Sequence, residues 1–288
     1  MPPRHRLSLS LLPLLGGAAL SLACNQSLEI GKRVELPLPD AAVNVDGGQD
    51  VGADDAAEPA EARLAPGDAT APTIIWSSGL ESGDTSDWSR DGAAIGGSNQ
   101  HLVTAAVSQE QTHNGMHALK IEFDTADGQD HLAEYYRKVE PGPAYYGAWF
   151  FIKEMHTPAT FWTVLYFFYQ TQAGNALTKH GLWDLNLNNK TVYFYNEVMK
   201  NYVDAVPRKP YPVGAWFHLE VRFAYEAPRN GHITVWQDGE QIMDIANLGA
   251  APGDNLYWGL GSETDALTPS NCTIYIDDAT VSTGRIGP

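Results

Sequence analysis

The sequence predicts an all-β protein, an antiparallel β-sandwich, and three observations support this fold class. Apolar and polar residues alternate in short runs, which is the periodicity of a strand with one buried face. Turn signals separate these runs, and many short strands with turns between them are typical of a sandwich. No window carries an apolar repeat of 3.6 residues over three turns, which an amphipathic helix would need.

Five segments show the alternation most clearly. In the first, Leu119, Ile121 and Phe123 alternate with charged residues, so one face of the strand is apolar. The third and fourth segments flank Asp238-Gly239, a dipeptide suited to a tight hairpin turn. Cys272 directly precedes the last segment and is expected to be a small buried side chain. The five segments are residues 119–124, 217–223, 232–237, 240–245 and 273–281.

Composition narrows the class of protein. The 288-residue chain is 43% hydrophobic and 18% charged, which argues against a wholly disordered protein. Its formal net charge is −17 and it has no cluster of Lys and Arg, so we expect no nucleic-acid partner. Two cysteines cannot form a disulfide framework.

Residues 1–23 are predicted to be a signal peptide of the lipoprotein type. Two arginines precede an apolar run that is too short and too interrupted to span a bilayer. The run ends before Cys24 in a sequence that resembles a bacterial lipobox, although Ser21 replaces the usual branched residue. This predicts lipidation of Cys24, with a lipid anchor as the only membrane contact. Asn25 then favours an outer-membrane address, and plain secretion is the alternative.

Residues 24–72 are predicted to be a disordered acidic tether rich in Ala, Pro, Asp and Gly. Residues 25–72 hold ten acidic residues against three basic ones, and none of the 30 aromatic residues of the chain. Such a segment cannot bury enough apolar area to offset the entropy lost on ordering. The folded domain is therefore predicted over residues 73–288.

Motifs at both ends of this domain carry a family likeness. It opens with Gly-Leu-Glu-Ser-Gly-Asp at 79–84 and closes with Ile-Tyr-Ile-Asp-Asp-Ala-Thr-Val at 274–281. His-Asn-Gly-Met-His-Ala-Leu at 113–119 and Gly-Ala-Trp-Phe-His-Leu-Glu at 214–220 lie between them. The ordered set resembles concanavalin A-like jelly-roll modules, which include carbohydrate-binding modules, laminin-G-like domains and polysaccharide lyases. Within that group it is most similar to a fungal jelly-roll protein induced together with cellulases. The resemblance covers nearly all of 74–285.

The resemblance also implies one structural Ca²⁺ ion. In that family the opening acid, the loop before the next strand and the closing aspartate meet around the ion. Carried over, this makes Glu81 and Asp277 side-chain ligands, with backbone carbonyls near Ser78 and Asn114. Ca²⁺ takes six to eight oxygen ligands, which is consistent with such a set. The alternative is that both acids are polar edge residues.

The central strands are predicted to carry a glycan-binding surface on a concave aromatic face. Trp183, Leu185 and Leu187 suit the core, which places the even positions of that strand on the other face. Aromatic rings suit the flat C–H faces of sugars, and Asn, Asp and Glu suit their hydroxyls, so we expect a polysaccharide partner. A solvated sheet covered by a loop is the alternative. The predicted substrate-binding residues are Tyr193, Tyr195, Asp184, Asn186, Glu197, Trp162 and Tyr166, extended by Tyr145 and Trp149.

A polysaccharide lyase that acts by β-elimination on a uronate polymer is the alternative function. It needs a base, an acid and a group that neutralises the uronate carboxylate. His180 and Tyr195 are the candidate base and acid, and Asn186 is the candidate neutraliser. The related fungal module has an arginine near this place, for which Arg137 is the only nearby cationic substitute here. The acidic domain would also repel a polyanion. A structural or adhesion protein without glycan activity is the third hypothesis.

A glycosidase is the least favoured hypothesis. Glu122 to Asp127 resembles a glucanase signature, but its last acid is aspartate rather than glutamate. Retaining hydrolysis needs two carboxyl groups about 5 Å apart. We therefore interpret this segment as a solvated strand face that leads into a turn.

Overall fold

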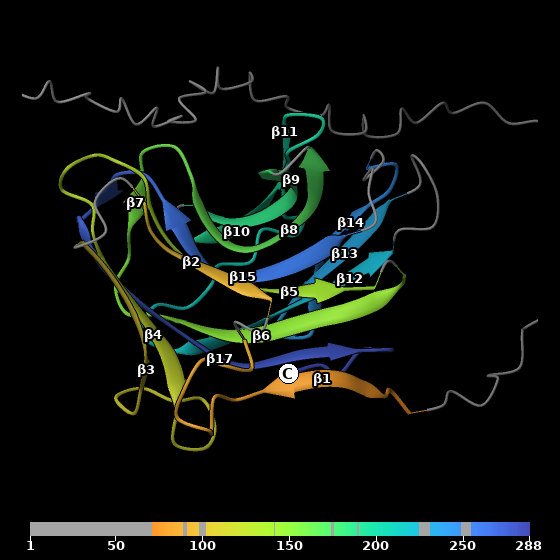
Figure 1. Cartoon of the computed structure of the whole chain (residues 1–288), viewed down its shortest axis with the longest axis horizontal. Coiled ribbons are helices and arrows are strands. Elements are labelled where there is room, and N and C mark those ends of the chain that lie inside the picture. Colours follow the sequence, from red (N-terminus) through yellow and green to blue (C-terminus); the bar gives the residue numbers. More distant parts are fainter. Residues whose placement is uncertain are drawn as a thin grey trace, which may run out of the picture. The chain divides into compact units, whose positions relative to one another are not determined.

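The computed structural model describes most of the chain from residue 71 onward and shows two antiparallel sheets stacked face to face (Figure 1). The predicted antiparallel β-sandwich is confirmed. The predicted signal peptide, Cys24 and the tether to residue 70 lie outside the described residues. The described ranges are 71–88, 91–97, 102–140, 142–173, 176–188, 190–224, 231–248 and 255–288.

All five strand segments that the alternation predicts belong to one eight-stranded sheet. Its order is β14-β13-β12-β6-β17-β4-β3, and β1 also pairs with β17. Asp238 and Gly239 both have positive φ (49° and 78°) in the β13–β14 hairpin, as the turn prediction requires. The strands are β1 (Ile74–Ser78), β3 (Val103–Ser108), β4 (Ala118–Asp124), β6 (Ala144–Ile152), β12 (Trp216–Ala224), β13 (His232–Gln237), β14 (Glu240–Ile245) and β17 (Asn271–Ser282).

The second sheet has seven strands in the order β11-β10-β9-β8-β15-β5-β2. Its long strands bend away from the other sheet, so the face turned away from the core is concave (Figure 1). A small pair, β7 (Thr157–Pro158) with β16 (Leu267–Thr268), lies apart from both sheets. The seven strands are β2 (Gly92–Gly97), β5 (His131–Val139), β8 (Trp162–Ala173), β9 (Ala176–Asn188), β10 (Thr191–Asn196), β11 (Asn201–Asp204) and β15 (Leu256–Thr264).

Aromatic rings from both sheets meet in the core. Phe223 of β12 contacts Trp183 of β9 and Phe167 of β8, with ring centroids 4.3 and 4.9 Å apart. Tyr146 of β6 also meets Phe167 edge-on at 5.1 Å. Cys272 is buried in the same core, as predicted. Pairs of large rings at these separations stabilise a sandwich beyond the apolar area they bury.

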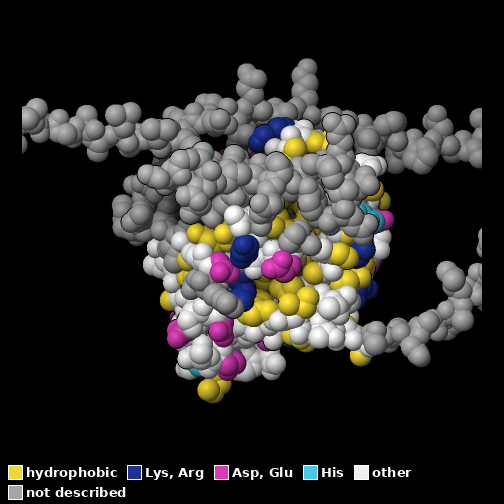
Figure 2. Space-filling view, turned by 45° about the vertical axis from the view of Figure 1, so that its right-hand side comes forward, with side chains coloured by type: hydrophobic (Ala, Val, Ile, Leu, Met, Phe, Trp, Pro, Cys, Tyr) yellow, Lys and Arg dark blue, Asp and Glu magenta, His cyan; other side chains and the backbone are white. Residues whose placement is uncertain are grey.

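The described surface mixes residue types. Figure 2 shows exposed hydrophobic side chains with acidic and basic ones set among them. Glu122 is paired with Lys120 at 3.0 Å, while Asp127 lies 2.8 Å from His131. These separate basic partners support the interpretation of residues 122–127 as a strand face and turn. No helix in the described ranges is long and apolar enough to cross a membrane.

A buried histidine makes the stability of the fold depend on pH. His156 is fully buried, and its Nδ1 donates to the carbonyl oxygen of Pro269 at 2.9 Å. Its Nε2 has no hydrogen-bond partner in the described part of the chain. Burial lowers the pKa of His156, because a proton on Nε2 would place a charge in the interior.

We expect His156→Phe to weaken the loss of stability on acidification. The unfolded chain takes up a proton at this histidine near pH 6.5, while the folded protein resists it until lower pH. The free energy of unfolding of the natural protein should therefore fall below about pH 6.5, more steeply than that of the variant. Urea unfolding across this range measures both. Equal pH dependence in the two proteins would contradict the expectation.

Candidate functional site

The central strands of the seven-stranded sheet alternate between the core and the outer face, as predicted. In the register of β9 and β10, Tyr195 lies opposite Asp184, and Tyr193 lies opposite Asn186. None of these four belongs to the hydrophobic core cluster. The alternating core residues are Trp183, Leu185, Leu187, Val192 and Phe194.

Three tyrosines form a cluster on this outer face. Tyr202 of β11 lies opposite Tyr195, with ring centroids 4.7 Å apart, and 5.7 Å from the ring of Tyr193. Tyr195 and Tyr202 are half-buried, whereas Tyr193 is only 6% exposed. Tyr193 thus supports the tyrosine cluster from below, and Tyr195 and Tyr202 present the accessible rings. Tyr202 was not among the binding residues predicted from the sequence, although the alternation of side chains along β11 could have indicated it.

A second set of rings, the central ring group, crosses β8, β15 and β5 on the same face. Phe168 and Tyr257 are stacked at 4.9 Å with 8° between their planes. Tyr136 meets both edge-on, at 5.2 and 5.9 Å, and Tyr166 stacks on Phe168 at 5.6 Å. Only Tyr166 of this group was predicted from the sequence. Tyr136 and Tyr257 are half-buried, so their rings are partly open to solvent.

Two glycines allow these rings to lie flat across the sheet. A Cβ at Gly259 would overlap the ring of Tyr166, and a Cβ at Gly92 would overlap the ring of Tyr136. Both glycines lie opposite these tyrosines in the strand register. Rings that cover strand glycines in this way fill the space of the missing side chains.

Polar groups lie among the rings. Glu134 of β5 is buried, and its carboxylate acts on the hydroxyl of Tyr166. Burial, and then the charges of Glu134 and Glu263, raise the pKa of Tyr166, so its hydroxyl stays protonated. Asn186 is buried, and its Oδ1 accepts a hydrogen bond from Thr163 at 2.7 Å. The outer face therefore combines rings with carboxylates, and neither Glu134 nor Glu263 was predicted.

The prediction that Trp162 lies on the glycan-binding face is wrong. It is fully buried in the core, where its indole N–H donates to Ser262 at 2.8 Å. The strand register shifts just after it, and both Val164 and Leu165 face the core. Such a β-bulge reverses the alternation, so Trp162 and Tyr166 lie on opposite faces although both are even-numbered.

Three further predicted positions lie off the concave face. Glu197 falls in the turn after β10, where its carboxylate pairs with Lys200 at 2.8 Å. Tyr145 and Trp149 belong to β6 of the other sheet, so their assignment to the glycan surface is wrong. Alternation gives the face of a residue within a sheet, but it does not identify the sheet.

The structure describes only part of the predicted catalytic set. The side chain of His180 lies outside the described part, and Leu182 and Trp183 both face the core, which breaks the alternation between His180 and Asp184. Burial, followed by the charge of Glu197, raises the pKa of Tyr195 to about 12, so it is a proton donor near neutral pH.

Arg137, the candidate cationic substitute, does not join this face. Its guanidinium lies over the ring of Trp76, 4.3 Å from the centroid, and donates to the carbonyl oxygen of Asp87. It also lines a small cavity together with Trp258, a residue of the core. The arginine therefore points away from Tyr195, into the space between the sheets.

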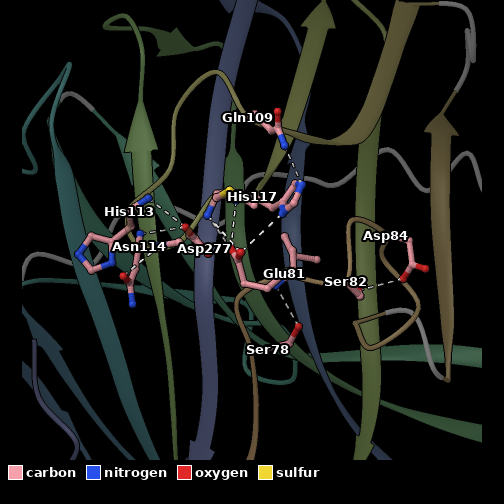
Figure 3. Close-up of polar contacts among 12 residues, drawn as sticks. Ser78, Glu81, Ser82, Asp84, Gln109, His113, Asn114, His117 and Asp277 are labelled. Atoms are coloured by element: carbon pink, nitrogen blue, oxygen red, sulfur yellow. Dashed lines mark hydrogen bonds and ion pairs between the residues drawn. The ribbon is translucent and has the colours of Figure 1, made fainter.

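The predicted metal ligands Glu81 and Asp277 approach the same loop, as Figure 3 shows. Asp277 is fully buried and accepts hydrogen bonds from the backbone N–H groups of His113 and Asn114, at 2.9 and 3.4 Å. Glu81 accepts from the backbone N–H groups of Met116 and His117, both at 3.0 Å. The two carboxylates thus fasten the 113–117 loop to both ends of the domain.

Asp278 brings a third carboxylate to this place, and Glu81, Asp277 and Asp278 are called the acid cluster below. A Cβ built on Gly79 would lie 3.0 Å from Asp278 Oδ1, 3.7 Å from Asp277 Oδ1 and 3.8 Å from Glu81 Cγ. Burial raises the pKa of Asp277 to about 6. These hard oxygen donors suit Ca²⁺ chemically. No three His, Cys, Asp or Glu side chains in the described ranges form a metal-binding group, so backbone carbonyls and water would have to complete the shell.

Comparison with known proteins establishes the fold. No family model and no curated protein matches the sequence. Endo-β-1,4-glucuronan lyase from the fungus Trichoderma reesei superposes with a TM-score of 0.55 at 14% identity, covering 74% of this chain and 96% of that one. The cellulose induced protein Cip1 gives a TM-score of 0.55 at 16% identity, with 74% and 99% covered. The predicted jelly-roll sandwich is thereby confirmed.

Proposed function

We propose that this protein binds a polysaccharide on the concave outer face of its seven-stranded sheet. One observation carries the proposal: aromatic rings from five strands gather on the face that does not pack in the core. A soluble domain rarely gathers so many rings on an outer face unless they contact a ligand. The accessible rings are those of Tyr136, Tyr195, Tyr202 and Tyr257, and the buried rings of Tyr166, Phe168 and Tyr193 support them.

The chemistry of the face favours a neutral polymer. The accessible rings of Tyr195 and Tyr202 at one end, and of Tyr136 and Tyr257 at the other, offer flat surfaces for the C–H faces of sugars. Carboxylates between and beside them accept hydrogen bonds from hydroxyls. The same carboxylates, in a chain of net charge −17, repel a polyanion. The likeness to two solved structures, one titled a glucuronan lyase from a fungus and the other a cellulose induced protein, supports a carbohydrate ligand.

Removing the two accessible rings of the tyrosine cluster tests this proposal. In affinity electrophoresis through gels containing β-glucan, xylan or galactomannan, we expect the natural protein to be retarded by at least one polymer. The double variant Tyr195→Ala/Tyr202→Ala should bind that polymer at least about tenfold more weakly, because aromatic rings in a contact carry much of its energy.

The matched control is Met116→Ala, which removes an exposed apolar side chain from the 113–117 loop. It should bind like the natural protein. Circular dichroism and the melting temperature test whether the double variant is folded. Unchanged affinity of a folded double variant would place the site elsewhere, and no retardation in any gel would remove the proposal.

Lyase activity can be tested separately with the same protein. Tyr195 is protonated and Asn186 is held by Thr163, while the side chain of the candidate base His180 lies outside the described residues. Because the acidic chain repels a polyanion, incubation with polyglucuronate should leave the ultraviolet absorbance of the C4–C5 double bond unchanged. A steady rise in that absorbance would overturn the assignment as a pure binding module.

We further propose that Glu81 and Asp277, with backbone carbonyls of Ser78 and Asn114, hold a structural Ca²⁺. The convergence of carboxylates near Gly79 and the burial of Asp277 support this. The ion would neutralise buried charge and tie the 113–117 loop to the closing strand. As a separate proposal, a lipid on Cys24 anchors the protein in the cell envelope, and the lipobox-like sequence before that cysteine supports it.

A further inference from the structure

A second groove lies on the outer face of the eight-stranded sheet, across the sandwich from the proposed polysaccharide face. Its volume is about 320 Å³. Three residues of β6 that alternate with core residues line it: Tyr145, Gly147 and Trp149. We call it the β6 groove; its polar lining includes His218, Glu220 and Asp278.

The β6 groove has two aromatic walls and a glycine floor. Tyr145 and Trp149 are four residues apart on one strand, about 13 Å along it. Between them, Gly147 leaves a slot in which the ring of His218 lies, and a Cβ on Gly147 would be 2.9 Å from His218 Nε2. A side chain at this position would therefore collide with the imidazole and fill the slot.

Both walls are held in place before any ligand arrives. Trp149 stacks on His113, with centroids 3.7 Å apart and 15° between the planes. Tyr145 stacks on Trp236 at 6.0 Å and 30°. Rings fixed by their neighbours lose little entropy when a ligand binds between them.

His218 is an unpartnered polar group at this place. It is 6% exposed, and its Nδ1 has no hydrogen-bond partner within the described ranges. Burial lowers the pKa of His218, which keeps the imidazole neutral near neutral pH. Buried polar groups in folded proteins nearly always have a partner, so this one calls for an explanation.

The two carboxylates of the groove already have partners. Glu220 is buried and accepts from Arg285 Nε and from the backbone N–H of Ile286, both at 2.9 Å. Asp278 Oδ2 is hydrogen-bonded to His113 Nδ1 at 2.7 Å. The groove is therefore polar, but its carboxylates do not need a bound cation to neutralise them. This favours an uncharged ligand with hydroxyl groups.

We infer that the β6 groove is a second ligand site, which takes one or two uncharged sugar rings between Tyr145 and Trp149. Its volume lies at the lower end of the range for small-molecule sites, about 300 to 1,000 Å³. The inference uses none of the residues of the concave face, so either site can exist without the other.

Titration of the full chain with cellobiose, followed by the Trp149 indole N–H in ¹H–¹⁵N NMR spectra, tests the inference. The natural protein should show a saturable shift of that signal, which Trp149→Phe identifies by its loss. Tyr145→Ala removes the other wall but leaves the reporter, and should weaken cellobiose binding at least about tenfold. Tyr195→Ala/Tyr202→Ala should leave the shift unchanged, which separates the groove from the concave face.

Charged relatives of glucose define the ligand class. Glucuronic acid and glucosamine should shift the Trp149 signal less than glucose does, because the carboxylates of the groove are already paired. A shift with only a charged sugar would overturn the uncharged class. No shift with cellobiose or glucose at tens of millimolar, or equal affinity in a folded Tyr145→Ala variant, would overturn the site. Gly147→Ala gives a second variant, which should abolish the shift because its Cβ takes space that the His218 ring occupies.

Discussion

We expect Gly259→Ala to lower the free energy of unfolding by about 3 kcal/mol and to abolish the proposed polysaccharide binding. This is the expected result because the new Cβ overlaps the ring of Tyr166, which cannot stay flat on the sheet. Overpacking costs about 1–3 kcal/mol, and a buried polar group that loses its partner costs about 1–3 kcal/mol more. Tyr166 is buried with its hydroxyl near the carboxylate of Glu134, so displacing the ring disturbs both its packing and this polar contact.

Gly142→Ala is the matched control for this substitution. A Cβ on Gly142 meets no atom within 4 Å and its φ is not positive, so stability should change by less than about 0.5 kcal/mol. Urea unfolding and affinity electrophoresis measure the two effects. A Gly259→Ala protein as stable as the natural one would show that Tyr166 has room to move. Lost stability with full affinity would separate the central ring group from the binding site.

The sequence predicted those features of the site that depend on strand alternation alone. Tyr193 and Tyr195 leave the core because Val192 and Phe194 enter it, and this alternation follows from the geometry of an extended chain. The prediction failed for Trp162, because a β-bulge adds one core residue to β8. A bulge has no dependable sequence signal, since it arises from how two distant strands pair.

The rest of the concave face depends on pairing between strands far apart in the chain. Tyr136 and Tyr257 meet because β5 pairs with β15, more than 100 residues later. In β5 the adjacent Tyr135 and Tyr136 point to opposite faces, so composition does not say which one is on the outer face. The register decides this, and a shift by one residue would exchange them.

Excess EDTA lowers the melting temperature by about 5–10 °C if Ca²⁺ occupies the acid cluster. A ligand present at one hundred times its dissociation constant stabilises the folded state by about 2.7 kcal/mol. For a folded domain of about 200 residues, each kcal/mol corresponds to about 2–4 °C. Scanning calorimetry with EDTA, and again after adding back CaCl₂, measures the shift.

Two carboxyl variants separate the ion from general electrostatics. Glu81→Gln should abolish the response to EDTA, because it removes one of two side-chain ligands. Asp84→Asn changes an exposed acid nearby whose hydrogen bonds within the described ranges are to Ser82 and Ser86, and it should retain the full response. An equal response in both variants would place the ion outside the acid cluster.

The response to EDTA should also shrink on acidification. Asp277 must be ionised to bind the metal, and burial raises its pKa to about 6 in the metal-free protein. Without metal, the folded state therefore holds this proton more tightly than the unfolded chain does. The resulting stability is fully present below about pH 3.8 and is lost as the pH rises through about 6.

Ca²⁺ replaces that proton above pH 6 and competes with it below, so EDTA should shift the melting temperature more at pH 7.5 than at about pH 5. An effect of EDTA that is equal at both pH values would rule out Asp277 as a ligand.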